Sequence, residues 1–237
     1  VYFGDTARIP YGTRSKETVI KYFFQSVRFL LTKEIKAIVV ACNTASALAM
    51  EEAQKVFDVP ISGVIEPGAK AAVSATRNSV IGVIGTEGTI NSQSYQRKIR
   101  KMLPSAEIIG IPCPLFVPIV EEGWESTDVA FITAKKYLLE LKEHNIDSLV
   151  LGCTHYPALR YTINKVLGDK VTMVNPAYET AKAGKIMLKE KGLLSSKLDG
   201  GKYHYYVSDD PEKFKRIGGN ILRKEIASVQ KVNIENL

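Results

Sequence analysis

A ten-residue pattern that occurs twice restricts the fold of this chain more than any other feature of its sequence. Residues 35–44, "IKAIVVACNT", align with residues 146–155, "IDSLVLGCTH", so that apolar positions coincide and Cys42 falls on Cys153. Each copy has the pattern of a buried strand, follows a long amphipathic helical pattern and precedes another helical pattern. A repeated unit of helix, strand, cysteine loop and helix predicts two similar lobes that face each other.

Strand and helix patterns alternate along most of the sequence, which predicts an α/β fold with mostly parallel sheets flanked by helices. The predicted strands lie near residues 36–41, 60–64, 79–84, 107–111, 147–151, 171–174 and 203–207. The predicted helices lie near residues 15–33, 45–57, 66–76, 91–102, 127–144, 157–167, 177–192 and 211–222. "VYF" at the start has the pattern of a strand end running into a glycine turn.

No linker rich in glycine and serine separates the two copies, so we expect the chain to cross between the lobes at short loops. Crossings near residues 63–68 and 174–179 would leave residues 1–66 and 176–237 in the first lobe. Residues 67–175 would then form the second lobe. Each lobe carries one of the two repeated cysteines, and we expect the active site in the cleft between them.

Charge and hydropathy limit the classes of function. A formal charge of +7 can indicate nucleic-acid binding, but lysine and arginine alternate with glutamate, as in "KETVIKYFFQSVRFLLTKE". No basic tract is interleaved with stacking aromatic residues, so solvated helix faces explain the charge better and we expect no nucleic-acid partner. No run of about 18 apolar residues and no secretory leader pattern occurs, so we expect a cytoplasmic protein without membrane contact.

Cysteine and histidine spacing argues against disulfides and metal. Three cysteines in 237 residues are no disulfide framework, so we expect free thiols at Cys42, Cys113 and Cys153. No CxxC spacing occurs, which disfavours both a thiol redox protein and a zinc site. The three histidines, which are His144, His155 and His204, are scattered along the chain.

Both repeated cysteines come directly after a predicted strand and before a predicted helix. Ligands of open parallel sheets bind at that place, where the N-terminus of a helix presents free N–H groups. We therefore expect each thiol to have its pKa lowered from about 8.5 toward neutrality, which would make it a base or a nucleophile. Asn43 and Thr44 after the first cysteine, and Thr154 and His155 after the second, can hold an ammonium or a carboxylate group.

Two equivalent thiols on opposite lobes suit a reaction that removes a proton from one face of a carbon and returns one to the other face. A single nucleophile needs no such partner, whereas racemisation or epimerisation by two bases does, because each direction uses one group as base and the other as acid. The alternative is that cysteines at strand ends are small buried hydrophobic residues. Cys113, in "GIPCPLF", lacks polar neighbours, and we interpret it as structural.

Other loops can complete a pocket around the thiols. "GTEGT" at residues 85–89 follows a predicted strand and offers Thr86, although glycine-rich turns are a weak signal by themselves. The turn-rich stretch "FGDTARIPYG" brings in Asp5, Tyr11 and Gly12. "FVPIVEEGW" contributes Glu121, which can carry a negative charge to the rim of the pocket.

The motifs together resemble the glutamate racemases of the aspartate/glutamate racemase group, which make D-glutamate for peptidoglycan without a cofactor. The segments that carry the resemblance are "YFGDTARIPYG", "ACNTAS", "VIEPG", "IGVIGTEGT", "CPLFVPIVEEG" and "GCTHYP". It implies a substrate of glutamate and a homodimer. Because relatives that act on aspartate usually carry a glutamate at the position of His155, it also favours glutamate over aspartate.

The resemblance also implies the roles of individual residues. It makes Cys42 and Cys153 the two catalytic acid/bases and places His155 beside them. The implied substrate contacts come from Tyr11, Gly12, Asn43, Thr44, Thr86, Thr154 and His155, and auxiliary charges from Asp5 and Glu121.

Relatives of this kind begin with a strand that ends in an Asp-Ser-Gly motif, upstream of the stretch "YFGDTA". The sequence opens at Val1 without that motif. We expect either further residues upstream in the natural protein or a weakened first lobe. Two other functions therefore stay open, an inactive ligand-binding or regulatory protein on the same scaffold and an aspartate-specific racemase.

Overall fold

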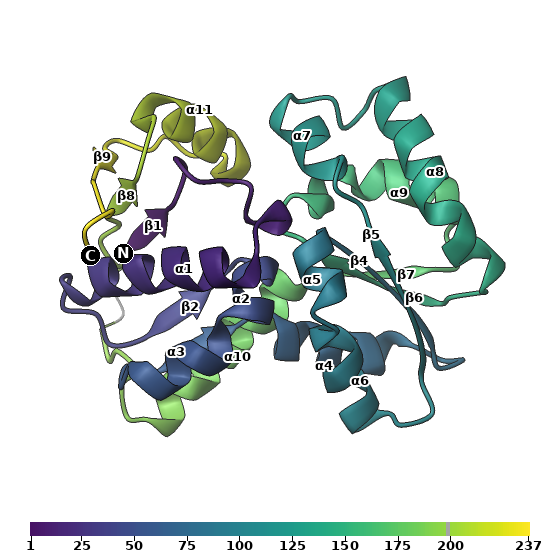
Figure 1. Cartoon of the computed structure of the whole chain (residues 1–237), viewed down its shortest axis with the longest axis horizontal. Coiled ribbons are helices and arrows are strands. Elements are labelled where there is room, and N and C mark those ends of the chain that lie inside the picture. Colours follow the sequence, from purple (N-terminus) through teal and green to yellow (C-terminus); the bar gives the residue numbers. More distant parts are fainter. Residues whose placement is uncertain (198–199) are drawn as a thin grey trace.

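The computed structural model describes residues 1–197 and 200–237 (Figure 1). Every strand pairing in this part of the chain is parallel. The strands are β1 (Tyr2–Gly4), β2 (Ile38–Val40), β3 (Ile61–Gly63), β4 (Val80–Gly85), β5 (Glu107–Pro112), β6 (Ser148–Gly152), β7 (Thr172–Val174), β8 (Tyr205–Val207) and β9 (Gln230–Lys231). They form sheets in the orders β1-β8-β9, β2-β3 and β5-β4-β6-β7, which confirms the predicted α/β class with parallel sheets.

Helices follow most of the strands. The first group is η1 (Tyr11–Thr13), α1 (Lys16–Leu31), α2 (Asn43–Leu48), α3 (Met50–Val56), α4 (Ile65–Ala75), α5 (Glu87–Asn91) and α6 (Ser94–Met102). The second group is α7 (Phe116–Glu121), α8 (Asp128–Glu143), η2 (Tyr156–Leu159), α9 (Arg160–Leu167), α10 (Pro176–Glu190) and α11 (Pro211–Leu222). In the described residues, no helix is both long and apolar enough to span a bilayer.

The elements gather into two lobes (Figure 1). The sheet β5-β4-β6-β7 lies on the right with α6, α8 and α9, and the other two sheets lie on the left with α1, α3 and α11. Strand β8 returns from the C-terminal part of the chain to pair with β1, so the N- and C-terminal segments share one sheet. Helices α2 and α5 meet between the lobes.

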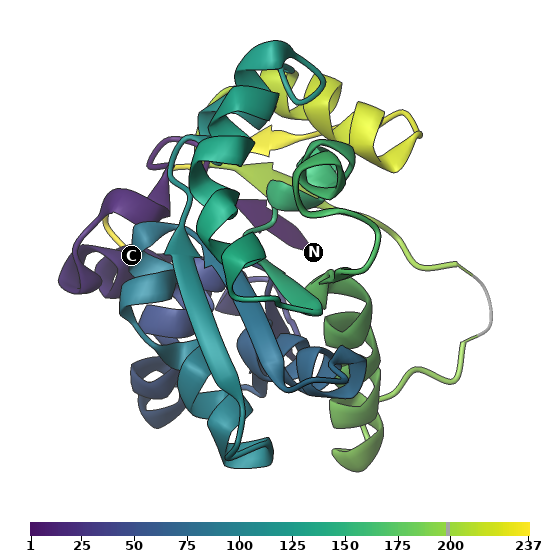
Figure 2. The same ribbon diagram turned by 90° about the vertical axis from the view of Figure 1, so that its right-hand side faces the viewer.

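The core of the second lobe follows the alternation of side chains along its strands. Figure 2 looks onto this lobe. Ile81 and Val83 of β4 pack on one face of the sheet with α4 and α6, while Ile84 of β4 and Leu149 of β6 pack on the other face with α7, α8 and α9. Both faces are covered by helices, as parallel sheets require, and the central strands are therefore continuous apolar runs.

Side-chain caps set the start of several helices. The Oγ atom of Ser15 accepts a hydrogen bond from the backbone N–H of Thr18 at the start of α1. Thr127 caps α8 in the same way, and Asn175 caps α10 directly before Pro176. Because these residues satisfy N–H groups that the helix leaves free, local sequence alone places these helix starts well.

Local backbone breaks changed some predicted helices. The predicted helix 45–57 is two helices, α2 and α3, which join at Ala49. The predicted helix 91–102 starts only at α6, because Gln93 has a positive φ of 56° that ends the preceding α5. Helix α7, which contains Pro118, and the two-residue strand β9 were not predicted.

Asp147 ties the loop between α4 and β4 to the start of β6. Its carboxylate accepts hydrogen bonds from the Thr76 hydroxyl at 2.6 Å and from the backbone N–H groups of Arg77 and Asn78 at 2.6 and 2.8 Å. Burial opposes ionisation of this carboxyl, but the hydrogen bonds outweigh it and lower the pKa of Asp147 below its ordinary value.

The lowered pKa predicts an acid-dependent contribution to stability. Stability from Asp147 is complete above the unfolded pKa of about 3.9 and is lost as the pH falls through the lower folded value. We expect Asp147→Asn to lower the free energy of unfolding by about 1–3 kcal/mol at pH 7. Urea denaturation of both proteins from pH 7 to pH 3 should show this difference shrinking with acid, and a constant difference would contradict the assignment.

Candidate active site

Four of the candidate residues lie in loops at the carboxyl ends of parallel strands. Asp5 follows β1, Cys42 comes two residues after β2, Thr86 follows β4 and Cys153 follows β6. These four strands belong to three sheets, and each of the four residues lies at the carboxyl end of its strand, where α/β proteins bind ligands.

Cys42 is the N-cap residue of α2. Its sulfur accepts a hydrogen bond from the backbone N–H of Ala45 at 3.5 Å. The residue is partly exposed. Burial in the cleft raises the pKa of the Cys42 thiol, although hydrogen bonds from Ala45 and Thr44 act in the opposite direction. The ligand-free thiol is thus held in its neutral form at pH 7.

Cys153 is more deeply buried, with 8% of its surface exposed. Burial raises the pKa of the Cys153 thiol to about 12, hydrogen bonds from His155 and Thr154 lower it in part, and negative charge on Cys42 raises it further. The two thiols therefore lie close enough for the charge of one to act on the other.

The expectation that both thiols have pKa values lowered toward neutrality is wrong for the ligand-free protein. Each cysteine does lie where helix or loop N–H groups point at its sulfur, as predicted from the sequence. Loss of solvation by burial costs each thiolate more than these N–H groups return.

His155 links Cys153 to a carboxylate. Its Nδ1 atom lies 3.7 Å from the sulfur of Cys153 and 3.5 Å from the hydroxyl of Thr154. Its Nε2 atom lies 3.3 Å from a carboxylate oxygen of Glu121, the last residue of α7. The carboxylate orients the ring so that Nδ1 faces the thiol.

A cluster of threonine hydroxyls joins the two lobes beside Cys42. The hydroxyl of Thr44 in α2 lies 2.9 Å from that of Thr86, which caps α5. Thr89, one turn into α5, lies 3.1 Å from Thr86. All three side chains are buried. The first turn of α2, directly after Cys42, is thereby hydrogen-bonded to the second lobe.

Gly12 allows η1 to approach the start of α5 closely. A Cβ atom at Gly12 would lie 2.4 Å from Cβ of Thr86 and 2.5 Å from its Cγ2. No other residue type fits between η1 and α5 without displacing this cap.

Asp5 and Tyr11 belong to one hydrogen-bond network in the first lobe. The carboxylate of Asp5 accepts hydrogen bonds from the hydroxyl of Tyr11, from Arg8 Nε at 2.7 Å and from Ser208 Oγ at 2.8 Å. Burial and the charge of Asp5 raise the pKa of Tyr11. No sequence pattern pointed to Arg8 or Ser208, and Ser208 lies too far along the chain for a local pattern to reveal it.

Asn43 has a partner from the other lobe that no sequence signal indicated. Its amide oxygen accepts a hydrogen bond from the hydroxyl of Tyr95, a residue of α6, at 2.7 Å. Both side chains are buried. Thr154, by contrast, is exposed.

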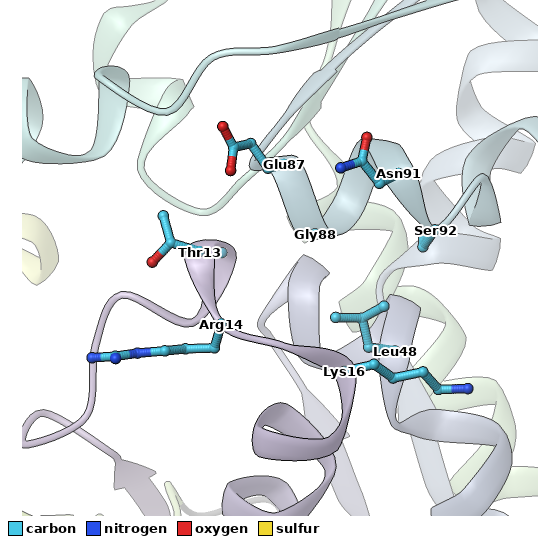
Figure 3. Close-up of a pocket in the computed structure, with 9 residues that line it drawn as sticks. Thr13, Arg14, Lys16, Leu48, Glu87, Gly88, Asn91 and Ser92 are labelled. Atoms are coloured by element: carbon cyan, nitrogen blue, oxygen red, sulfur yellow. The ribbon is translucent and has the colours of Figure 1, made fainter.

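A cavity of about 390 Å³ borders the site at Gly12 (Figure 3). It lies between the start of α1 and helix α5, and its lining residues are Gly12, Thr13, Arg14, Lys16, Leu48, Glu87, Gly88, Asn91 and Ser92. Neither cysteine lines it. Within the described residues, no group of three or more histidine, cysteine, aspartate or glutamate side chains is placed to hold a metal ion.

The arrangement has clear relatives. The family model described as Asp/Glu/Hydantoin racemase matches residues 1–184. The chain belongs to this racemase family. A glutamate racemase of Geobacter metallireducens is 47% identical over 235 residues, which cover 99% of this chain and 87% of that protein.

Solved structures agree with this membership. The crystal structure of a glutamate racemase isoform from Bacillus anthracis superposes with a TM-score of 0.93 at 39% identity and covers 98% of this chain and 86% of its own. The glutamate racemase of Francisella tularensis, solved in complex with D-glutamate, has a TM-score of 0.91 at 38% identity, over 100% of this chain and 88% of its own. The two-lobed fold of this racemase is therefore that of solved glutamate racemases.

Proposed function

We propose that this protein interconverts L- and D-glutamate by proton transfer between Cys42 and Cys153, and that it is therefore an isomerase that needs no cofactor. The observation that carries the proposal is the placement of the two thiols at the ends of β2 and β6, close enough for the charge of Cys42 to act on Cys153. Membership of the racemase family and relatives named glutamate racemase support the choice of substrate.

The reaction needs one thiolate and one thiol at a time. In the L-to-D direction, the Cys153 thiolate takes the Cα proton and the Cys42 thiol gives its proton to the opposite face, and in the reverse direction the two exchange roles. The raised pKa of the ligand-free thiols makes each thiolate, once formed, a stronger base toward a weakly acidic C–H bond. The ammonium group of a bound amino acid would favour formation of that thiolate.

The polar residues around the thiols suit an amino acid with two carboxylates. We propose that backbone and side-chain donors of Asn43, Thr44 and Thr154 hold the carboxylate and ammonium groups at Cα. Thr86 from the second lobe and the loop of Tyr11 and Gly12 from the first lobe would complete the pocket, with Asp5 acting through Tyr11. Donors that point at the developing negative charge in a cleft with little water lower the barrier to proton removal.

His155, which Glu121 orients, would adjust how readily the Cys153 thiol loses and regains its proton. We expect His155→Asn to lower kcat about tenfold, because the variant loses a charge-assisted contact at the thiol. Glu121→Gln should reduce kcat less, since it keeps a hydrogen-bond acceptor for the ring. Steady-state rates in both directions test this order.

The matched control is His144→Asn, which removes a similar pair on the surface, where His144 Nδ1 lies 3.2 Å from Glu107. This variant should keep full activity. Equal losses in the His144 and His155 variants would contradict the assigned role of His155.

The experiment that tests the proposed function is proton NMR in deuterated water without added cofactor. L-glutamate and D-glutamate are followed separately for loss of the Cα proton and for formation of the opposite isomer. Exchange and inversion from both isomers support the racemase. Binding of glutamate without exchange would favour an inactive binding protein, and exchange of aspartate in preference would favour the aspartate-specific alternative.

Family membership also supports a biological role, a cellular location and an oligomeric state for this enzyme. We propose that the enzyme supplies D-glutamate for peptidoglycan in the cytoplasm and acts as a homodimer. We further propose that the lobes divide as residues 1–66 with 176–237 and residues 67–175. Analytical ultracentrifugation tests the oligomeric state, with a monomer as the contradicting result.

A further inference from the structure

Tyr95 is a buried residue close to the segments that carry Cys42 and Cys153. It belongs to α6 of the second lobe, and only 1% of its surface is exposed. Its hydroxyl reaches across the lobe boundary to Asn43, the residue after Cys42. A Cβ atom at Gly152, the residue before Cys153, would lie 3.4 Å from Cε2 of the Tyr95 ring. The Tyr95 side chain thus hydrogen-bonds to the neighbour of Cys42 and lies beside the neighbour of Cys153.

The space for the Tyr95 hydroxyl is built into the fold. A Cβ atom at Gly68 in α4 would lie 2.9 Å from this hydroxyl, so only a glycine at that position leaves the oxygen where it is. Burial and the charge of Cys153 raise the pKa of Tyr95, so the hydroxyl keeps its proton at neutral pH. A protonated hydroxyl can donate to an amide oxygen or accept from an amide N–H, and the Tyr95 hydroxyl donates to Oδ1 of Asn43.

The direction of that hydrogen bond decides which end of the Asn43 amide is free. The oxygen is occupied by Tyr95 at 2.7 Å, and no other partner of the amide group occurs among residues 1–197 and 200–237. Asn43 is only 4% exposed, so its two N–H groups, which have no acceptor in the described part of the chain, are the ones left for a ligand that enters beside Cys42. Two donors suit a carboxylate, whereas a flipped amide would present an oxygen and repel it.

We propose that Tyr95 is a positioning residue that holds the Asn43 amide with its nitrogen toward a carboxylate of the amino-acid substrate. The inference deepens the proposed function and rests on it. Tyr95 itself does not touch the reacting atoms. Because its hydroxyl comes from the second lobe and Asn43 from the first, the contact also couples the orientation of this donor to the way the lobes pack.

The test compares Tyr95→Phe with the unaltered protein and with Tyr156→Phe. Tyr156 is equally buried in the same lobe, and its hydroxyl donates to the backbone oxygen of Cys113 at 2.8 Å. Both variants lose one buried hydrogen bond, so we expect similar losses of thermal stability. Only Tyr95→Phe should raise the KM for both isomers and the Kd for D-glutamate about tenfold, with a smaller change in kcat.

A double-mutant cycle with Asn43→Ala separates positioning from packing. In the Asn43→Ala background, Tyr95→Phe should change Kd and KM by less than about twofold, because the group that it orients is gone. If Tyr95→Phe does not fold, Gly68→Ala serves instead, because its Cβ would lie 2.9 Å from the Tyr95 hydroxyl and 3.0 Å from Cγ of Pro176. The Asn43→Ala background separates the effect on the hydroxyl from the effect on Pro176. Gly68→Ala should raise Kd in the same direction and lose this effect beside Asn43→Ala.

Unchanged Kd and KM in Tyr95→Phe would overturn the inference, and so would an equal effect with and without Asn43. Either result leaves the proposed function intact if the unaltered protein racemises glutamate. An unaltered protein that neither exchanges nor binds glutamate contradicts the proposed function itself, and the inference falls with it.

Discussion

Replacing Cys42 with serine will reduce interconversion of the glutamate isomers at least about 1000-fold in both directions, and Cys153→Ser will do the same. Each thiol serves as base in one direction and as acid in the other. A serine hydroxyl loses its proton far less readily than a thiol, so it can supply neither the base nor a matched acid. Serine is nearly the same size as cysteine, and the packing around each site should change little.

Cys113→Ser is the matched control for this pair. Cys113 is fully buried, and its thiol donates to the backbone oxygen of Ile111 at 3.6 Å, a contact that a hydroxyl can keep. This variant should retain activity. The measurement is deuterium exchange at Cα together with polarimetry for all three variants. A Cys42→Ser protein that racemises at the normal rate would exclude the two-thiol mechanism.

Gly12→Ala should lower activity at least about 100-fold. The new methyl group would lie 2.4 Å from Cβ of Thr86, so either η1 or the start of α5 must move. Thr86 is buried and hydrogen-bonded to Thr44, and its displacement would shift the segment that carries Cys42. The strain should also reduce the free energy of unfolding by about 1–3 kcal/mol.

Gly184→Ala provides the control for this substitution. Gly184 lies inside α10, and a Cβ atom there would be 3.6 Å from Val39 Cγ2, which is ordinary contact. Alanine should keep activity and stabilise the helix by roughly 0.5–1 kcal/mol. Activity assays and urea denaturation of both variants test the pair. Full activity of Gly12→Ala would contradict the prediction, because it would mean that Thr86 can move without disturbing the active site.

Much of the fold could be predicted from the sequence because it depends on local patterns. Apolar runs with neighbouring turns predicted β2 to β8 within a few residues, and helical periodicity predicted α1 and α8 within two residues of their ends. The prediction failed where tertiary contacts outweigh local preference. Helix α7 is only six residues long and carries Pro118 in its first turn, where proline is tolerated, and Phe116 and Ile119 bury their side chains in the core of the second lobe.

The site was predictable in outline but not in detail. The repeated strand and cysteine pattern located Cys42 and Cys153, and neighbouring positions pointed to His155. The pairing of His155 with Glu121 depends on α7, which the local pattern did not predict. No local pattern predicts that Tyr95 would reach Asn43, since 52 residues separate them.

The sequence by itself determined that two thiols follow parallel strands, because the order of apolar and polar residues along each segment sets where a strand ends and a loop begins. Only the tertiary structure decided how those thiols behave. Their pKa values are raised because side chains that are far apart in the sequence bury the two thiols. The positions of Asn43, Thr44 and Thr86 depend on contacts between the lobes. Solvation and cross-lobe hydrogen bonds are properties of the whole packed molecule, and no single stretch of the chain contains them.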